Sequence, residues 1–361
     1  MTTDVTVAVH FRTCVSLYCV GASIAAGCAV HPDDQDSKLP APSEEIQLIE
    51  EIRVSASDPD SPLIGYPGRV DVDERGFMYV TDWREKTVWV LDPDGNHIRN
   101  IGSQGEGPGQ FRTAPGVTYI EGDSVIVFGQ QGLDVFDRNT GEYRQRHSFP
   151  ASVAGRVWLI LARSYPEHVV LLENEVFRVA VDGDSAEKLL TLPAHGRITA
   201  DDGFWERASF NRIPWCSSTA TKIYCGFSED LRFVVMSAAT GDSLGTINVE
   251  FEPLQISGSE RADILDRYKG TRYAKRLEIP ETWPAYRETL GDDRERLWIT
   301  LRTRHDEVET ILWVVDPASN TSSYAAVAGD LYASSVRNGK LYGTLTDTDG
   351  DVSVVRYGIR E

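Results

Sequence analysis

The sequence is poor in basic residues for its length. Its 361 residues hold 36 Lys and Arg against 55 Asp and Glu, which gives a formal net charge of -19. Nucleic acids and anionic lipid surfaces bind proteins through clustered Lys and Arg side chains, and a strongly acidic chain repels them. We therefore expect no nucleic-acid partner and no direct binding to an anionic membrane surface.

Long hydrophobic runs are also scarce. The uncharged stretch CVSLYCVGASIAAGCAV, residues 14–30, is too short and too weakly flanked to span a membrane as a helix. It ends in the small residues AAGC and resembles a bacterial lipoprotein signal, in which cleavage precedes a cysteine that is then lipidated. The resemblance implies a signal peptide over 1–27, lipidation of Cys28 and an acidic, proline-bearing tether over 28–43. The alternative is an unstructured, weakly apolar tail.

This resemblance also predicts the location of the protein. A lipidated Cys28 would hold it on the periplasmic side of a bacterial cell envelope, and without lipidation it would be secreted. Contact with the membrane would then be made only through the lipid anchor.

Motifs of common catalytic and metal sites are missing or incomplete. GDSLG at 241–245 satisfies G-x-S-x-G, but it lies in a turn between predicted strands, so Ser243 lacks the strand-to-helix setting of a nucleophile. GSQGEGPGQF at 102–111 is followed by another strand, whereas a dinucleotide loop opens a helix. DTDGD at 347–351 lacks the other ligands of a calcium loop, and no H-E-x-x-H occurs. We predict no cofactor and no metal, and we favour a protein that is not an enzyme.

Short apolar runs punctuated by Gly, Asp, Asn and Pro recur throughout, and long helical periodicity is rare. Each repeat has an aromatic strand, such as RGFMYV, and then an apolar strand ending in an acidic turn, such as VWVLDPDG. The second strand recurs 45 residues apart at Leu91, Phe136 and Val181, and 40 residues apart at Val315 and Val355. Periods in the forties with several strands each are typical of propeller blades. The sequence predicts an all-β fold of six four-stranded antiparallel blades.

The last repeat lacks an outermost strand, because the sequence ends after VSVVRYGIRE. EEIQLIEEIRV at 44–54 is an apolar strand without a blade of its own. Pairing it with the last blade closes the ring and covers an edge that would otherwise be exposed. We therefore predict one propeller domain over 44–361.

The segment IGSQGEGPGQFRTAPGV is similar to the inter-blade motif of NHL repeats, and the whole pattern resembles the bacterial NHL-like six-bladed β-propeller lipoproteins. A second sharp likeness is PETWPAYRETLGDDRERLWITL, which looks like the start of a blade after a helical insertion in that family. The resemblance covers most of 44–361 and implies a binding protein of the cell envelope. The glycines then serve as a hinge between blades, with Phe111 as a wedge.

An insertion at 257–282, between blades four and five, has the pattern of a short helix. Ser257 and Glu260 form a possible capping box, and Ile264, Leu265 and Tyr268 could line one helical face. The helix either forms a lid over the central funnel or covers apolar blade surface. The sequence leaves both interpretations open.

Two cysteines flank the turn-like stretch SSTATKIY. Cys216 and Cys225 could face each other across one hairpin and form a disulfide if the protein is exported. In a reducing cytosol they would be buried thiols, because nothing near them has the spacing of a zinc site.

The candidate ligand-binding residues lie in segments predicted to face the funnel. Arginines and tryptophans gathered on one face of an acidic chain could bind an anionic or carbohydrate-like ligand. Alternatively, these side chains bind each other and cap strand ends. The candidates are Trp83, Arg84, Arg112, Arg207, Arg212, Trp283, Arg287, Arg302, Arg304 and His305.

The function predicted first is non-catalytic binding of a protein partner or small ligand at the funnel face, by a protein that we expect to be a monomer. The alternative is a hydrolase of the lactonase or phosphotriesterase propeller type, whose axial metal is held by Glu, Asp and Asn side chains of inner strands. The sequence shows no recognisable copy of that ligand set.

Overall fold

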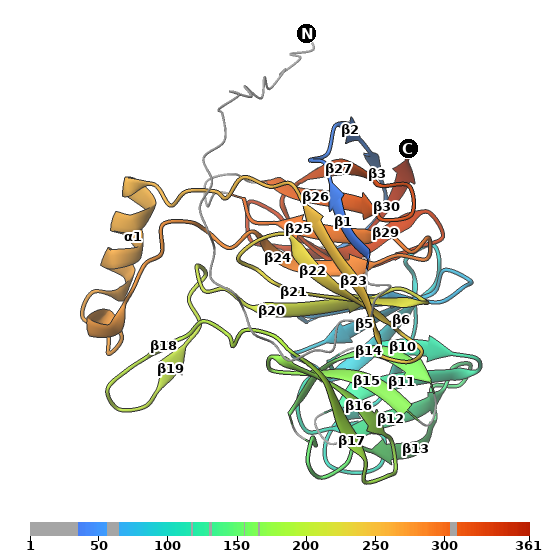
Figure 1. Cartoon of the computed structure of the whole chain (residues 1–361). Coiled ribbons are helices and arrows are strands. Elements are labelled where there is room, and N and C mark those ends of the chain that lie inside the picture. The colour runs from blue at the N-terminus through green and yellow to red at the C-terminus, as the bar shows by residue number, and fades with distance from the viewer. Residues whose placement is uncertain are drawn as a thin grey trace.

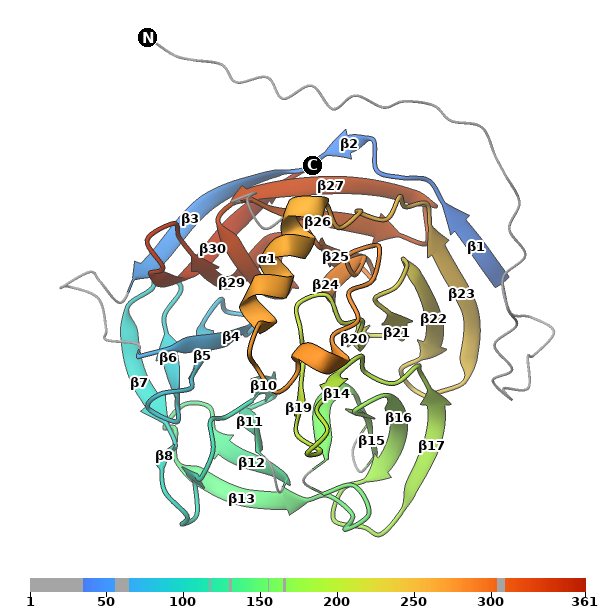
Figure 2. The same ribbon diagram turned by 90° about the vertical axis from the view of Figure 1, so that its left-hand side faces the viewer.

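The computed structural model describes residues 35–55, 65–116, 118–129, 132–154, 156–164, 167–303 and 309–361. Six β-sheets stand around a common axis, as the blades of a propeller (Figure 2). Successive strands of each blade pair antiparallel and run from the centre of the ring outward. The predicted six-bladed, mostly β fold is therefore confirmed.

The strands are as follows. Blade one contains β4 (Pro67–Val72), β5 (Met78–Asp82), β6 (Thr87–Leu91) and β7 (His97–Ile101). Blade two contains β10 (Thr118–Glu121), β11 (Ser124–Gly129), β12 (Gly132–Asp137) and β13 (Tyr143–Ser148), and the short strands β8 (Ser103–Gln104) and β9 (Gln110–Phe111) precede it. Blade three contains β14 (Val157–Ser164), β15 (Glu167–Leu172), β16 (Glu175–Ala180) and β17 (Ala186–Thr191).

Blade four contains β20 (Pro214–Ser218), β21 (Lys222–Phe227), β22 (Arg232–Ser237) and β23 (Ser243–Val249). Blade five contains β24 (Tyr286–Gly291), β25 (Leu297–Leu301), β26 (Glu309–Asp316) and β27 (Thr321–Ala328). Blade six contains β28 (Asp330–Arg337), β29 (Lys340–Thr346) and β30 (Val352–Arg360), and β3 (Gln47–Ser55) completes it by pairing with β30. The predicted closing strand is thus present.

The acidic turns of the repeats hold the outer hairpins together. Asp92 Oδ1 accepts hydrogen bonds from the backbone N–H groups of Asp94, at 2.9 Å, and Asn96, at 2.8 Å. Asp137 Oδ1 accepts in the same way from the N–H groups of two residues of its own turn, Asn139 and Thr140. A carboxylate that binds backbone N–H groups ahead of it stabilises a tight turn, which explains why Asp recurs at this place.

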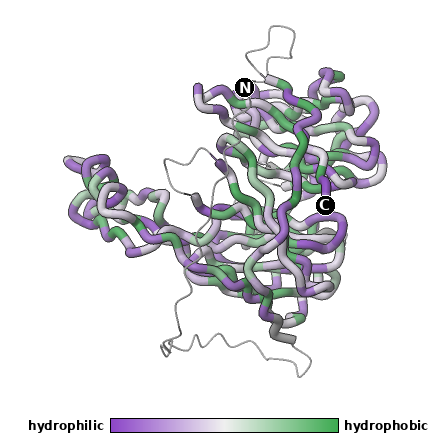
Figure 3. Tube along the Cα trace, turned by 90° about the horizontal axis from the view of Figure 1, so that it is seen from above, coloured by the Kyte–Doolittle hydropathy of each residue, from purple (hydrophilic) through white to green (hydrophobic). Residues whose placement is uncertain are grey.

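The hydrophobic core is divided among the gaps between blades. Within the described residues, each pair of neighbouring blades shares a cluster of buried side chains. Figure 3 shows hydrophobic and hydrophilic stretches alternating along the chain. Because each blade buries its faces only against its neighbours, the ring must close for every core to be covered.

The segment predicted as a free tether over 28–43 is in part a strand. β1 (Gln35–Leu39) pairs parallel with β23, and β2 (Glu44–Glu45) pairs parallel with β27, so blades four and five have five strands instead of four. Leu39 is fully buried beside Val249 in the core between these blades. Figure 2 shows β1, β2 and β3 following one another around the outside of the ring. Cys28 and the predicted signal over 1–27 lie outside the described residues.

Two insertions project from one face of the ring (Figure 1). One carries the helix α1 (Gly258–Tyr268), which begins with the predicted capping box, and the 3-10 helix η1 (Ala274–Arg276). The other carries a hairpin of β18 (Ile198–Thr199) and β19 (Trp205–Glu206), which the sequence did not predict. No helix among the described residues is long and apolar enough to cross a membrane.

The two insertions pack on each other and form a cap, defined here as residues 193–213 and 250–285. Ile264 and Tyr268 of α1 are buried with Phe210 in a hydrophobic cluster of the cap. The Tyr268 hydroxyl also donates a hydrogen bond to Glu206 at 2.8 Å. Leu265, predicted to share the buried face of the helix, is 53% exposed, so that part of the prediction is wrong.

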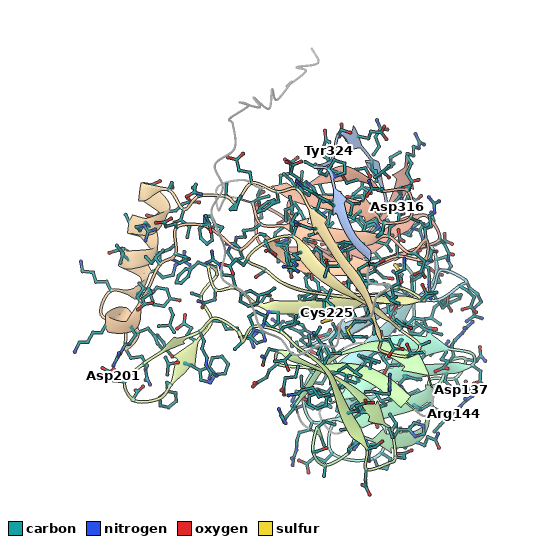
Figure 4. All side chains as sticks on the ribbon, viewed as in Figure 1. Asp137, Arg144, Asp201, Cys225, Asp316 and Tyr324 are labelled. Atoms are coloured by element: carbon teal, nitrogen blue, oxygen red, sulfur yellow. A yellow bond between two sulfur atoms is a disulfide. The ribbon has the colours of Figure 1, made fainter. Side chains whose placement is uncertain are left out.

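Cys216 and Cys225 are directly paired across β20 and β21, with their Cα atoms 4.2 Å apart, and form a disulfide in the interior of blade four (Figure 4). This pairing agrees with the sequence interpretation for an exported protein. Disulfides persist in oxidising compartments, so the bond indicates a location outside the cytoplasm.

Removing this disulfide is expected to lower the free energy of unfolding by about 2 to 3 kcal/mol, because the cross-link restricts a short loop of the unfolded chain. Urea unfolding of the Cys216→Ala, Cys225→Ala double variant measures the loss. Wild-type protein treated with a reductant is the control and should lose a similar amount. Equal stability of the double variant and the wild type would contradict the expectation.

Candidate functional site

The candidate site lies at the mouth of the central channel on the capped face. Every inner strand starts at this face, and the second strand of each blade returns to it. In blade one, the Trp83 N–H donates to the carbonyl of Tyr66 at 3.0 Å; in blade five, the Arg302 N–H donates to the carbonyl of Ala285 at 3.2 Å. Trp83 and Arg302 therefore occupy equivalent positions around the mouth.

Arg302 is the central residue of the site. Its guanidinium lies 4.8 Å from the centre of the Trp283 ring, and its Nε atom is buried without a hydrogen-bond partner among the described residues. Burial, followed by the positive charge of Arg287, lowers the pKa of Arg302 from its usual value. A guanidinium held in this way has an unsatisfied donor and an environment that disfavours its charge.

Two further arginines lie on the same face: Arg287, whose charge acts on Arg302, and Arg212. Arg212 donates from Nη2 to the carbonyl oxygen of Thr282 at 3.2 Å and to its hydroxyl at 2.8 Å, so Arg212 and Arg302 contact adjacent residues, Thr282 and Trp283. Arg287 is paired with Asp330 and also donates to the carbonyl of Leu331 at 3.0 Å.

Nearby carboxylates neutralise only part of the positive charge of Arg212, Arg287 and Arg302. Among the described residues, Asp330 pairs with Arg287, and Glu260 accepts a hydrogen bond from Trp283 Nε1 at 3.2 Å. Both oxygens of Glu260 are engaged, because the second accepts from the Ser257 N–H at 2.8 Å. A local excess of positive charge in a chain of net charge -19 suits an anion.

The other predicted site residues are distributed over the same face and beyond it. The side chain of Trp83 is about half exposed, with its ring centre 5.7 Å from that of Tyr66. Arg207 lies on the cap, 5.9 Å from the ring centre of Trp205, and burial lowers its pKa. Trp283, predicted to contact the ligand, is 3% exposed, and its ring lies against the Arg302 guanidinium.

Two other predicted arginines lie on the loops of blade one and of the crossing to blade two, and Arg84 is exposed beside Gly65. Arg112 forms an exposed ion pair with Glu106 within the glycine-rich crossing between blades one and two. The backbone N–H of Arg84 donates to the carboxylate of Asp82 at 2.8 Å in the turn after β5. Arg304 and His305 lie outside the described residues.

Below the mouth, the channel is lined by all six inner strands. A cavity of about 160 Å³ touches one or more residues of each blade. Two hydroxyls on its wall, Thr118 Oγ1 and Ser334 Oγ, are buried and have no hydrogen-bond partner in the described part of the chain. Among the described residues, no group of three or more His, Cys, Asp or Glu side chains is placed to hold a metal ion.

Glu288 is an ionisable residue beside the channel that the sequence analysis missed. The residue is 3% exposed, and no described residue forms a hydrogen bond with its Oε1 atom. Burial raises the pKa of Glu288 to about 7, against the opposing effect of the Arg69 and Arg287 charges. The sequence signals it only by a carboxylate in the middle of the strand segment YRETL.

These features define the class of the protein: a six-bladed β-propeller whose channel mouth carries an arginine cluster beneath a cap. Residues 56–156 match the model of the DUF5128 family, described as a 6-bladed beta-propeller. The match covers less than a third of the chain. The finer resemblance to NHL-repeat lipoproteins stays a prediction.

Solved structures show the same fold. A protein of Bacteroides fragilis, described as a candidate exported protein, has 10% identity and a TM-score of 0.54 over 90% of this chain and 99% of its own. A DUF4221 family member from Bacteroides vulgatus has 10% identity and a TM-score of 0.52 over 88% of this chain and 99% of its own. No curated protein sequence matches the chain. At such identities the likeness establishes the fold alone.

Proposed function

We propose that this protein is an exported, non-catalytic propeller that binds a carboxylate-bearing ligand at the capped channel mouth through Arg212, Arg287 and Arg302. The ligand is a small molecule or a carboxylate group of a protein partner. The disulfide supports export. Attachment to the periplasmic side of the envelope through a lipid on Cys28 is part of the proposal, with secretion as the alternative.

The observation that carries the proposal is the unsatisfied Nε of Arg302. The guanidinium presents parallel N–H groups that match the two oxygens of a carboxylate, and such charge-assisted pairs are among the stronger hydrogen bonds. A bound carboxylate would give Nε an acceptor and offset the repulsion between Arg302 and Arg287. A neutral ligand could supply an acceptor but would leave that repulsion in place.

The test is isothermal titration calorimetry with citrate and succinate as probes. Arg302→Gln is expected to weaken binding by about tenfold or more, because a hydrogen bond to a charged group contributes about 1.5 to 3 kcal/mol. Arg144→Gln is the matched control, since Arg144 pairs with Asp123 and Asp137 on the outer part of blade two (Figure 4). The proposal fails if the wild type binds neither probe, or if Arg302→Gln binds them as the wild type does.

A further inference from the structure

Exposed aromatic side chains are confined to the capped face. Among the described residues, the aromatic side chains that are more than about a third exposed are Tyr66 (49%), Trp83 (48%), Phe204 (62%) and Trp205 (51%). The first two adjoin the mouth at blade one, and the last two lie on the hairpin of the cap. The other exposed large hydrophobic residues are aliphatic.

The pair formed by Tyr66 and Trp83 is held in place by the backbone. Besides the bond between their main chains, the carboxylate of Asp82 accepts hydrogen bonds from the N–H groups of Gly65, at 2.6 Å, and Tyr66, at 3.3 Å. The Trp83 indole lies against Gly68, where a Cβ atom would come within 2.4 Å of Nε1. Gly68 belongs to the inner strand β4, so the indole lies over the mouth of the channel and not at the outer rim.

Trp205 offers a second aromatic surface, with basic groups beside it. The guanidinium carbons of Arg197 and Arg207 lie 5.7 and 5.9 Å from its ring centre. Its neighbour Phe204 is flanked by Arg272, at 4.6 Å from the ring centre. The hairpin therefore presents aromatic rings together with cationic groups on the face that also carries Arg302.

A simple anion would use the arginines alone and would leave these rings unused. A sugar ring has an apolar face that packs on an aromatic ring, while its hydroxyl groups stay in contact with water and polar side chains. A sugar acid adds a carboxylate, which the guanidinium groups of Arg302 and Arg212 match. A chain of sugar acids would present both features repeatedly across the mouth.

We propose that the ligand of the capped mouth is an acidic oligosaccharide, with a carboxylate bound by Arg302 and Arg212 and sugar rings packed on Trp83 with Tyr66 and on Trp205. This inference rests on the proposed function, because it names the class of the carboxylate ligand. It adds two aromatic subsites that the binding of a simple carboxylate does not require.

The experiment compares an oligogalacturonate with monomeric galacturonate and with citrate by calorimetry. The wild type should bind the oligosaccharide about tenfold or more tightly than the monomer. Trp83→Ala and Trp205→Ala should each weaken binding of the oligosaccharide by about three- to tenfold and leave citrate binding unchanged. Leu244→Ala, which shortens another exposed side chain on β23, is the control and should change neither affinity.

The outcomes separate the two proposals. If citrate binds through Arg302 but the oligosaccharide binds no better than the monomer, the acidic oligosaccharide is excluded and the proposed function stands. If a fully methyl-esterified oligogalacturonate binds as tightly as the acid, the carboxylate does not direct binding of the oligosaccharide, and this inference is overturned. Citrate binding and its dependence on Arg302 then decide the proposed function. If oligoglutamate binds as tightly as the oligogalacturonate, the ligand class is a peptide and this inference is overturned.

Discussion

Replacing Phe111 with alanine is expected to lower the free energy of unfolding by about 3 to 5 kcal/mol, the usual cost of deleting a buried phenylalanine ring. Phe111 is 4% exposed and lies in the core between blades one and two. Its ring packs between Ile101, on the last strand of blade one, and Phe136 of blade two, with the two phenylalanine ring centres 5.9 Å apart. The substitution is therefore expected to destabilise the packing between blades one and two.

The glycine motif is built around this ring. Gly102 has a positive φ of 69°, and a Cβ atom there would lie 2.2 Å from the Phe111 ring. Glycine is needed at this position both for the backbone conformation and for the space. The prediction from sequence of an inter-blade hinge with an aromatic wedge is confirmed.

Urea unfolding measures the effect of Phe111→Ala. Phe111→Leu should lose less, because it keeps most of the buried surface. Phe204→Ala removes a ring of the same chemistry at a position that is 62% exposed, and it should cost less than about 1 kcal/mol. A loss below about 1 kcal/mol for Phe111→Ala would show that the ring does not hold the two blades together.

The fold could be predicted because a blade is a local structure. Its strands follow one another in sequence, so aromatic strands and acidic turns such as that at Asp92 repeat with a readable period. The closing strand β3 was predicted from its lack of any other partner. β1 was missed because an outer strand needs few buried side chains, and Leu39 is nearly alone in a polar, proline-bearing segment. Residues 44–45 were assigned to the closing strand of the last blade, but as β2 they pair with β27 of blade five.

The candidate site could be predicted only in outline. Arg302 was recognised because it follows an aromatic strand, a position that returns to the channel mouth in every blade. The orientation of Trp283 was not predictable, because the cap that buries it is built from two insertions far apart in sequence. Glu288 was missed for a similar reason: besides its sequence neighbour Arg287, the charges that act on it belong to Arg69 of blade one and Asp330 of blade six.

The last expected result concerns the pH dependence of stability at Glu288. The pKa of this carboxyl is about 7 in the folded protein and 4.5 in its ordinary state, so the folded chain holds the proton more tightly than the unfolded chain. Below pH 4.5 the carboxyl is protonated in both states and does not reduce the free energy of unfolding. As the pH rises from 4.5 to about 7, the free energy of unfolding falls, because the unfolded chain loses the proton more readily. The full penalty is on the order of 3 kcal/mol above that range, at about 1.36 kcal/mol for each pKa unit.

Glu288→Gln should remove this penalty, because the amide stays neutral and its oxygen can still accept the hydrogen bond that the carboxylate receives from the Ala333 N–H. The wild type should lose about 3 kcal/mol more than the variant between pH 4.5 and pH 8 when both are unfolded in urea. Glu142→Gln makes the same chemical change at an exposed position and should follow the wild type. Parallel pH profiles for the wild type and Glu288→Gln would mean that Glu288 is ionised throughout, with a cation or water beside the unsatisfied oxygen.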